Sequence, residues 1–281
     1  MSHERDAPFH LGGAAASLAW TSSVGVGALL VAAWLLPGHY MTTALVVAAA
    51  VAIGCGAAIA CLATASRRRE PTERELVRLL GSPMLAVRPL REEAMRGLAR
   101  QLLEHWLRPG HAVLPVVSAQ SGEGRTYLAA HLAAAFARLG EKTLLIDADF
   151  RSPGLHGAFG LPNRGGLADY LKGTKVEPHV CNENLAVLVA GSVGRDPLAL
   201  LGGERLKGLL AAAGKHFRVI IVDTPAAARG PDLEIFAALA GGALVVAGRA
   251  SPRPLQRLRA ALARASAQPL AIVVNQRQPA P

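Results

Sequence analysis

A loop that could hold a phosphate group lies in the middle of the chain, with the sequence SAQSGEGRT. Gly122 and Gly124 allow backbone N–H groups to point at a phosphate, and the helix expected behind them adds positive potential. Thr126 opens that helix, where its hydroxyl could bind Mg²⁺. The loop alone is a weak signal, because Ser118 replaces the first glycine of the common phosphate-loop pattern and Arg125 replaces its lysine.

Three acidic side chains follow the loop along the chain. Asp147 and Asp149 end the apolar run KTLLIDAD, and Asp223 ends the run VIIVD. Mg²⁺ prefers oxygen ligands, which carboxylates supply directly or through bound water. A single aspartate of this kind is more often a helix cap or turn residue. Three of them at the ends of apolar runs, all after the loop, indicate a phosphate–Mg²⁺ centre.

The elements that position these residues alternate along the chain. Apolar runs predict strands, and amphipathic segments between them predict helices, so we expect an α/β fold with a doubly wound, mostly parallel sheet covered on both faces. The expected strands are residues 112–118, 142–149, 184–191, 218–225, 243–249 and 270–276. Ligands of such sheets bind at the carboxyl ends of the strands, which is where the sequence places Ser118, Asp147, Asp149, Asp223 and Asn275.

Two uncharged apolar runs, residues 11–36 and 41–65, precede this domain. Each exceeds the roughly 20 residues that a helix needs to cross a bilayer. Only PGHY separates them, so we expect an antiparallel transmembrane hairpin behind a leader at residues 1–10. Arg67–Arg69 follow directly, and the positive-inside rule places that end in the cytoplasm. A helix pair buried in a soluble protein is the alternative.

The composition fits this layout. The chain has 281 residues, a net charge of +10 and 51% hydrophobic residues. A balance this basic indicates an anionic partner, or else an arginine-rich solvated surface. The three cysteines show neither metal-ligand spacing nor a disulfide framework. We divide the remainder into a basic juxtamembrane linker at 66–84, a phosphate-loop domain at 85–276 and a short tail at 277–281.

Residues 85–276 resemble the bacterial tyrosine kinases of capsule and exopolysaccharide synthesis, in the MinD/ParA-like branch of P-loop ATPases with a deviant Walker motif. SAQSGEGRT is similar to the family's S-x-x-P-G-E-G-K-[ST]. LLIDADFRSPGLHGAFGLPNRGGLADYLKG resembles its second Walker A-type motif and the segment after it. NLAVLVAGSVGRDPLALLGGERLKGLL resembles the next stretch, and VIIVDTPA resembles its Walker B motif.

The resemblance implies ATP and Mg²⁺ as cofactors and a role for each matching position. Thr126, Asp149 and Asp223 would hold the metal, and Asp147 would activate the attacking hydroxyl. Arg125 would take the place of the family's catalytic lysine. The residues implied in nucleotide binding are Ser121, Gly122, Glu123, Gly124, Arg125, Thr126, Tyr127 and Asn275.

Three departures from the family pattern bear on activity. Arg125 is longer and fork-shaped where the family has a compact lysine. The chain ends NQRQPAP, without the cluster of tyrosines that the family's tail carries. The oligomerisation motif E-x-x-R-x-x-R reads EAMRGLAR, in which Glu93 and Arg96 match and Ala99 replaces the last arginine. Between the two apolar runs, only PGHY remains where the family has a large external domain, a difference that lies outside the phosphate-loop domain.

We therefore expect a membrane-anchored ATP-binding protein of polysaccharide synthesis or export, with weak or regulatory tyrosine-kinase activity. It would lie in the bacterial inner membrane as a multi-pass protein, with the ATP-binding domain in the cytoplasm. The implied partners are a polysaccharide copolymerase, further copies of the chain, and anionic lipid at the basic linker. The alternatives are a non-catalytic adaptor of a copolymerase and a MinD/ParA-type positioning ATPase. The hairpin counts against the last of these and against nucleic acid as a partner.

Overall fold

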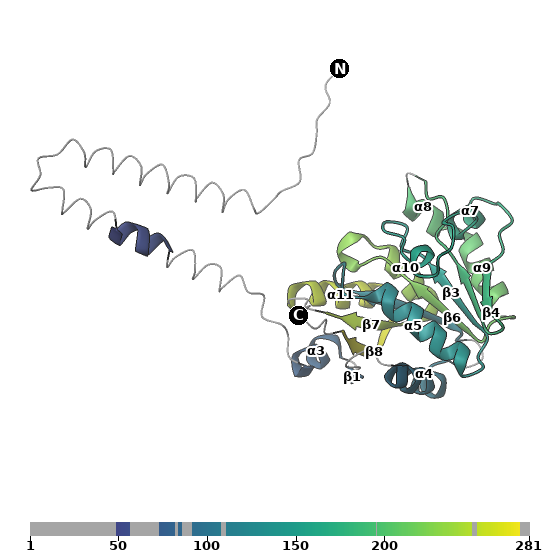
Figure 1. The fold of residues 1–281 in the computed structure, drawn as a ribbon, viewed down its shortest axis with the longest axis horizontal. Coiled ribbons are helices and arrows are strands. Elements are labelled where there is room, and N and C mark those ends of the chain that lie inside the picture. The colour runs from purple at the N-terminus through teal and green to yellow at the C-terminus, as the bar shows by residue number, and fades with distance from the viewer. Residues whose placement is uncertain are drawn as a thin grey trace, which may run out of the picture. The chain divides into compact units, whose positions relative to one another are not determined.

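The chain forms two compact units, residues 1–68 and 69–281, which are described separately (Figure 1). In the first unit, residues 49–56 are helical. The rest of the predicted hairpin at 11–65 lies outside the described residues. No helix in the part of the chain that is described is long and apolar enough to span a bilayer. The computed structural model describes residues 49–56, 73–81, 84–85, 92–107, 111–194, 196–248 and 252–275.

The second unit is built on an eight-stranded sheet in the order β1-β8-β7-β2-β6-β3-β5-β4. All neighbouring strands are parallel except β4 and β5, which are antiparallel. The expected mostly parallel sheet is therefore confirmed. The strands are β1 (Met84–Leu85), β2 (Val113–Ser118), β3 (Thr143–Asp147), β4 (His179–Asn182), β5 (Leu185–Leu188), β6 (Val219–Asp223), β7 (Gly242–Ala247) and β8 (Gln268–Val274).

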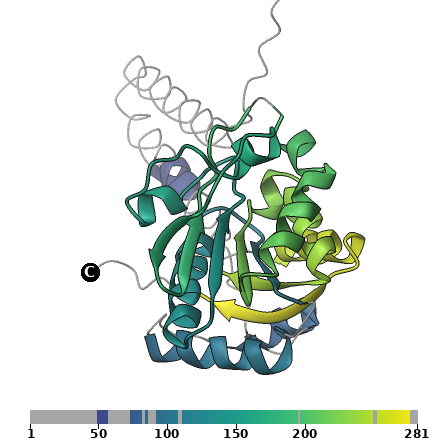
Figure 2. The same ribbon diagram turned by 90° about the vertical axis from the view of Figure 1, so that its right-hand side faces the viewer.

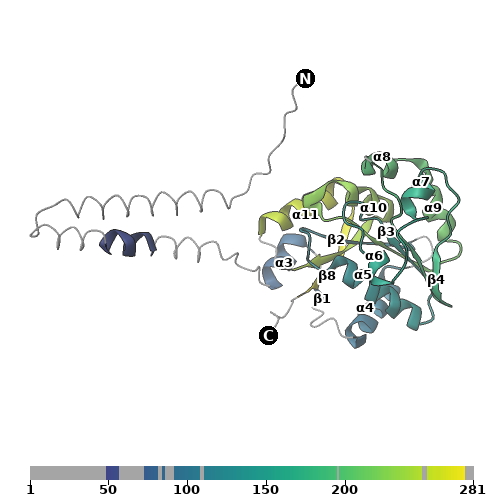
Figure 3. The same ribbon diagram turned by 45° about the horizontal axis from the view of Figure 1, so that its top comes forward.

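Helices cover both faces of this sheet (Figures 2 and 3). On one face α4 and α5 pack on side chains such as Leu114, Leu145 and Ile221. On the other face α3, α9, α10 and α11 pack on the residues that alternate with them. The helical segments are α3 (Glu73–Leu80), α4 (Glu92–His105), α5 (Arg125–Arg138), α6 (Leu155–Ala158), α7 (Leu167–Leu171), α8 (Pro197–Leu201), α9 (Glu204–Ala213), the 3₁₀ turn η1 (Ala227–Arg229), α10 (Asp232–Ala240) and α11 (Pro252–Arg264).

Most of the elements that the sequence did not predict lie between β3 and α9, and the others are the two-residue strand β1 and the turn η1. Helices α6, α7 and α8 are one turn long or little more, which is too short for a helical repeat of apolar residues to register. Strand β4 is an exposed edge strand, and Val180 in it is 79% exposed. Such a strand buries no face, so its sequence lacks the apolar alternation that marks a strand.

Helix α4 explains one departure from the family pattern. Its core-facing residues are Met95, Leu98, Ala99 and Leu102, and Ala99 is completely buried. An arginine at position 99 would therefore have to enter the core, whereas Arg100 next to it is exposed. Arg96, the arginine of the motif that does match, forms an ion pair with Glu92 of its own helix.

Candidate functional site

The phosphate loop connects β2 to α5, as the sequence predicted. Gly122 and Gly124 have φ angles of +80° and +93°, in the left-handed region that favours glycine. At position 124 a Cβ atom would also lie 2.1 Å from the Nδ2 atom of Asn275. That amide nitrogen donates a hydrogen bond of 2.9 Å to the carbonyl oxygen of Glu123. Asn275, at the end of β8, therefore lies directly against the loop.

The buried side chain of Glu123 links the loop to the end of β7 through hydrogen bonds. Its side chain is buried, and its Oε2 atom accepts a hydrogen bond of 2.8 Å from the backbone N–H of Gln120. The other oxygen accepts from the backbone N–H of Gly248, just after β7, at 3.4 Å. Burial raises the pKa of Glu123 above its usual value. The sequence grouped Glu123 with the nucleotide-binding residues, and its side-chain bonds are to the protein backbone.

Asp147 and Asp223 are directly opposite each other on the neighbouring parallel strands β3 and β6. Asp147 Oδ2 accepts hydrogen bonds from the backbone N–H groups of Gly154, at 3.1 Å, and Leu155, at 3.0 Å. Asp147 thus binds the start of α6, and its Oδ1 atom accepts from the N–H of Asp149. Burial raises the pKa of Asp147 to about 6, close to what a general base needs at neutral pH.

Asp223 has a different environment. Its side chain is completely buried, and neither carboxylate oxygen has a hydrogen-bond partner among the described residues. Burial raises its pKa to about 7, the neighbouring Asp147 carboxylate adds to that increase, and the Thr126 hydroxyl and Arg125 oppose it. A buried carboxylate without a partner is costly and indicates a missing cation or ligand.

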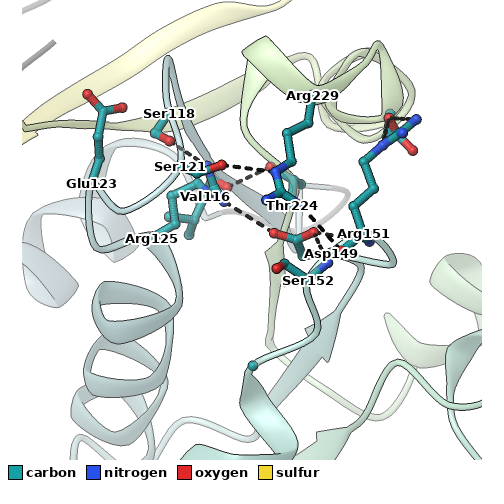
Figure 4. Close-up of polar contacts among 12 residues, drawn as sticks. Val116, Ser118, Ser121, Glu123, Arg125, Asp149, Arg151, Ser152, Thr224 and Arg229 are labelled. Atoms are coloured by element: carbon teal, nitrogen blue, oxygen red, sulfur yellow. Dashed lines mark hydrogen bonds and ion pairs between the residues drawn. The ribbon is translucent and has the colours of Figure 1, made fainter. Parts of the chain in front are cut away.

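Arg125 points into the protein from the first residue of α5 (Figure 4). Its Nη2 atom lies 3.2 Å from Asp149 Oδ2, in an ion pair whose two side chains are 7% and 5% exposed. Its Nη1 atom donates to Ser118 Oγ at 2.5 Å and to the Gln120 carbonyl at 3.4 Å. The cation that the sequence assigned to phosphate binding is therefore held by protein oxygens. Asp149, the acid that the sequence assigned to the metal, accepts hydrogen bonds from Arg125 and from the backbone N–H groups of Arg151 and Ser152.

Two further arginines, which no pattern in the sequence marked as site residues, lie beside the loop (Figure 4). Arg151 forms an ion pair of 3.0 Å with the buried carboxylate of Asp232 at the start of α10. Arg229, in η1, donates a hydrogen bond of 3.1 Å from Nε to Ser121 Oγ and one of 3.3 Å from Nη1 to the Arg151 carbonyl. The signal for Arg151 was its place two residues after Asp149, at the end of a strand. Arg229 follows Asp223 within a loop without a recognisable pattern.

Tyr127 lies on the outer side of α5 and is 50% exposed. Its ring stacks on His131 with 3.9 Å between the ring centroids. The two rings line a groove of about 520 Å³ between α5 and α6, which reaches Thr126 at one end and Phe159 at the other. Tyr127 thus borders the loop on the α6 side, and its part in nucleotide binding stays a prediction.

The residues present fit a magnesium ion. No three His, Cys, Asp or Glu side chains among the described residues converge as a complete metal site. Mg²⁺ does not require one, because it is usually held by one or two protein oxygens, substrate phosphates and water. The unpartnered Asp223 carboxylate, with the Thr126 hydroxyl beside it, offers such a pair next to the loop.

Comparison with known proteins agrees with this geometry. Residues 114–230 match the CobQ/CobB/MinD/ParA nucleotide binding domain. The tyrosine-protein kinase YwqD of Bacillus subtilis (strain 168) is 35% identical over 166 residues, which are 57% of this chain and 70% of that protein. The tyrosine-protein kinase etk of Escherichia coli (strain K12) is 33% identical over 159 residues, which are 55% of this chain but only 22% of that protein.

The fold is shared as well. The solved kinase domain of the Escherichia coli tyrosine kinase ETK superposes with a TM-score of 0.62 at 27% sequence identity. That match covers 68% of this chain and 78% of the solved domain. The chain therefore belongs to the bacterial tyrosine-kinase family, within the CobQ/CobB/MinD/ParA group of nucleotide-binding domains.

Proposed function

We propose that this protein binds Mg²⁺–ATP at the loop between β2 and α5 and acts in bacterial exopolysaccharide or capsule synthesis or export. The observation that carries the proposal is Asp223, a completely buried carboxylate with no partner among the described residues, beside a loop shaped for phosphate. A cation that arrives with a nucleotide would relieve the cost of that burial. The polysaccharide context comes from the family resemblance.

Each residue of the site has a role in this proposal. The backbone N–H groups of residues 121–126 bind the phosphates, and Asn275 holds the loop next to the nucleotide. Thr126 and Asp223 bind the metal, which when present neutralises charge on the transferred phosphoryl group. Asp147 accepts the proton of the attacking hydroxyl, as its raised pKa permits. Asp149 positions Arg125 through their ion pair.

The same ion pair makes weak or regulatory activity the expected outcome. Arg125 is turned toward Asp149 and Ser118, so its positive charge is compensated by a buried carboxylate instead of being free for the terminal phosphates. Small misplacements of a catalytic group lower a rate by orders of magnitude. We therefore expect nucleotide binding to be retained and phosphoryl transfer to be slow.

The test is binding of a fluorescent ATP analogue to the full chain in detergent, with and without Mg²⁺. We expect micromolar binding that depends on Mg²⁺ and is lost in Asp223→Asn and Thr126→Val. Exposed Arg257 on α11 provides a matched control, and Arg257→Ala should bind like the unmodified chain. Absence of binding at millimolar nucleotide would refute the proposal.

A non-catalytic adaptor is the second candidate, and the inward direction of Arg125 favours it. The two candidates differ in their response to Arg125→Lys, which restores the residue type of the family pattern. Transfer of radioactive phosphate from ATP to the chain, or to an added tyrosine polymer, should rise about tenfold in that variant if the protein is a slowed enzyme. An unchanged rate at background level would identify the adaptor.

We propose in addition that the apolar runs at 11–36 and 41–65 anchor the protein in the bacterial inner membrane as a hairpin. Residues 49–56 are helical with apolar side chains turned outward, Ile53 being 73% exposed, which suits a lipid-facing helix. The basic linker would then contact anionic lipid, and a copolymerase with its own external domain would be the membrane partner. Recovery of the chain from membranes washed at high pH would support this anchor, and its release would refute it.

A further inference from the structure

Three arginines lie at the phosphate loop, and they differ in whether a carboxylate neutralises their charge. Arg125 is paired with Asp149, and Arg151 is paired with Asp232. Both partner carboxylates are buried. Arg229 has no carboxylate partner among the described residues, because its hydrogen bonds go to a hydroxyl and a carbonyl oxygen. It is therefore the cation of the site whose charge remains available to a ligand.

Arg229 also lies where a ligand of the phosphate loop could reach its charge. Its two hydrogen bonds join Ser121, within the loop, to the backbone of Arg151, on the segment after Asp149. The side chain thus reaches from η1 across the gap between the two segments that enclose the phosphate site (Figure 4). Arg229 and Ser121 are both exposed, so an incoming phosphate meets the guanidinium directly.

The backbone beside Arg229 is fixed by close packing. A Cβ atom at Gly230 would lie 2.6 Å from Asp232 Oδ2 and 2.7 Å from Arg151 Nη2. A larger residue at position 230 would push against the Arg151–Asp232 ion pair, so the chain beside Arg229 packs closely on that pair. Arg229 is therefore presented to the loop from a tightly packed base, which lowers the entropy lost when its side chain binds a ligand.

We propose that Arg229 binds the terminal phosphate of the nucleoside triphosphate and supplies the positive charge that the loop's own cation directs to Asp149. The guanidinium has planar N–H donors that suit phosphate oxygens. Its present bonds to Ser121 and Arg151 are to neutral groups, which a doubly charged phosphate replaces favourably. The proposal rests on the proposed nucleotide-binding function and assigns one specific contact within it.

The test compares the affinities of the full chain in detergent for ATP and for ADP, both with Mg²⁺, by competition with a fluorescent analogue. In Arg229→Ala we expect the dissociation constant for ATP to rise about tenfold or more, as for loss of a charged hydrogen bond. The constant for ADP should change much less, so the preference for ATP falls. Arg229→Lys should recover part of the preference for ATP, and Arg257→Ala should leave both dissociation constants unchanged.

Each other result contradicts the proposal in a recognisable way. Equal weakening of ATP and ADP in Arg229→Ala would mean that the residue only supports the loop through Ser121. Unchanged dissociation constants for both nucleotides would mean that Arg229 does not touch the terminal phosphate, while the proposed function stands. Failure of the unmodified chain to bind either nucleotide would overturn both.

Discussion

Arg125 and Asp149 form an ion pair of 3.2 Å that is almost completely shielded from solvent, with side chains 7% and 5% exposed. One residue opens the helix after the phosphate loop, and the other follows the next strand in the chain. The pair therefore ties together the two segments between which a nucleotide would bind. It also directs the charge of Arg125 to Asp149, whereas Arg229 at the same loop has no carboxylate partner among the described residues.

Breaking this pair should destabilise the protein strongly. In Arg125→Ala the Asp149 carboxylate stays buried without its cation, and we expect the free energy of unfolding to fall by about 3–5 kcal/mol. Urea denaturation followed by circular dichroism measures this. The double variant Arg125→Met/Asp149→Asn removes both charges but keeps an acceptor for the backbone N–H groups of Arg151 and Ser152, so it should lose less stability than Arg125→Ala alone. A single variant as stable as the unmodified chain would show that the pair contributes nothing.

Asp223→Asn should abolish metal binding without lowering the stability of the ligand-free protein. The substitution removes a buried carboxylate whose oxygens have no partner among the described residues, so at about pH 8 the ligand-free variant should be at least as stable as the unmodified chain. The increase in melting temperature caused by Mg²⁺–ATP should disappear in the variant, because ligand stabilisation follows affinity. Thermal unfolding with and without Mg²⁺–ATP measures both. A variant that keeps the full increase would exclude Asp223 as a metal ligand.

The ligand-free protein should lose stability as the pH rises through the neutral range. Burial raises the pKa of Asp147 to about 6 and that of Asp223 to about 7, from a usual value of 3.8. The folded state then binds more protons than the unfolded state between these limits. This contribution to stability is complete below the unfolded pKa and is lost as the pH rises through the two folded values.

Melting temperatures measured at about pH 5.5 and about pH 8 test this direction. Asp223→Asn removes one of the two groups and should reduce the difference. Addition of Mg²⁺–ATP should reduce it further, since a cation favours the charged carboxylate. A protein that is more stable at the higher pH, with no change in the variant, would contradict the raised pKa values.

Gly124→Ala should lower the stability of the protein by more than its backbone strain alone would. Gly140→Ala is the matched control. Both glycines are left-handed, with φ angles of +93° and +85°, so each alanine carries a strain of about 1–2 kcal/mol. A Cβ atom at 124 would overlap the Asn275 amide, whereas one at 140 meets nothing within 4 Å. We expect a larger loss of melting temperature at 124 and loss of nucleotide binding only there. Equal effects at both positions would show that Asn275 simply moves aside.

The sequence by itself determined the parallel sheet, the loop and the acids at strand ends. These features are local, because apolar runs mark buried strands, glycines mark a loop with special backbone angles, and the residue after an apolar run lies at the end of its strand. Strand β4 and the short helices α6 to α8 were not predicted, because they bury too little surface to impose a pattern on their sequence.

Only the tertiary structure decided where the charged side chains point. The sequence placed Arg125 at the loop but could not show that it pairs with Asp149, which is 24 residues away. Arg229 meets Ser121 across 108 residues, and Arg151 meets Asp232 across 81. Long flexible side chains choose among partners that the folded chain brings together, and their choice depends on burial and competing charges. Neither quantity can be obtained from local sequence patterns.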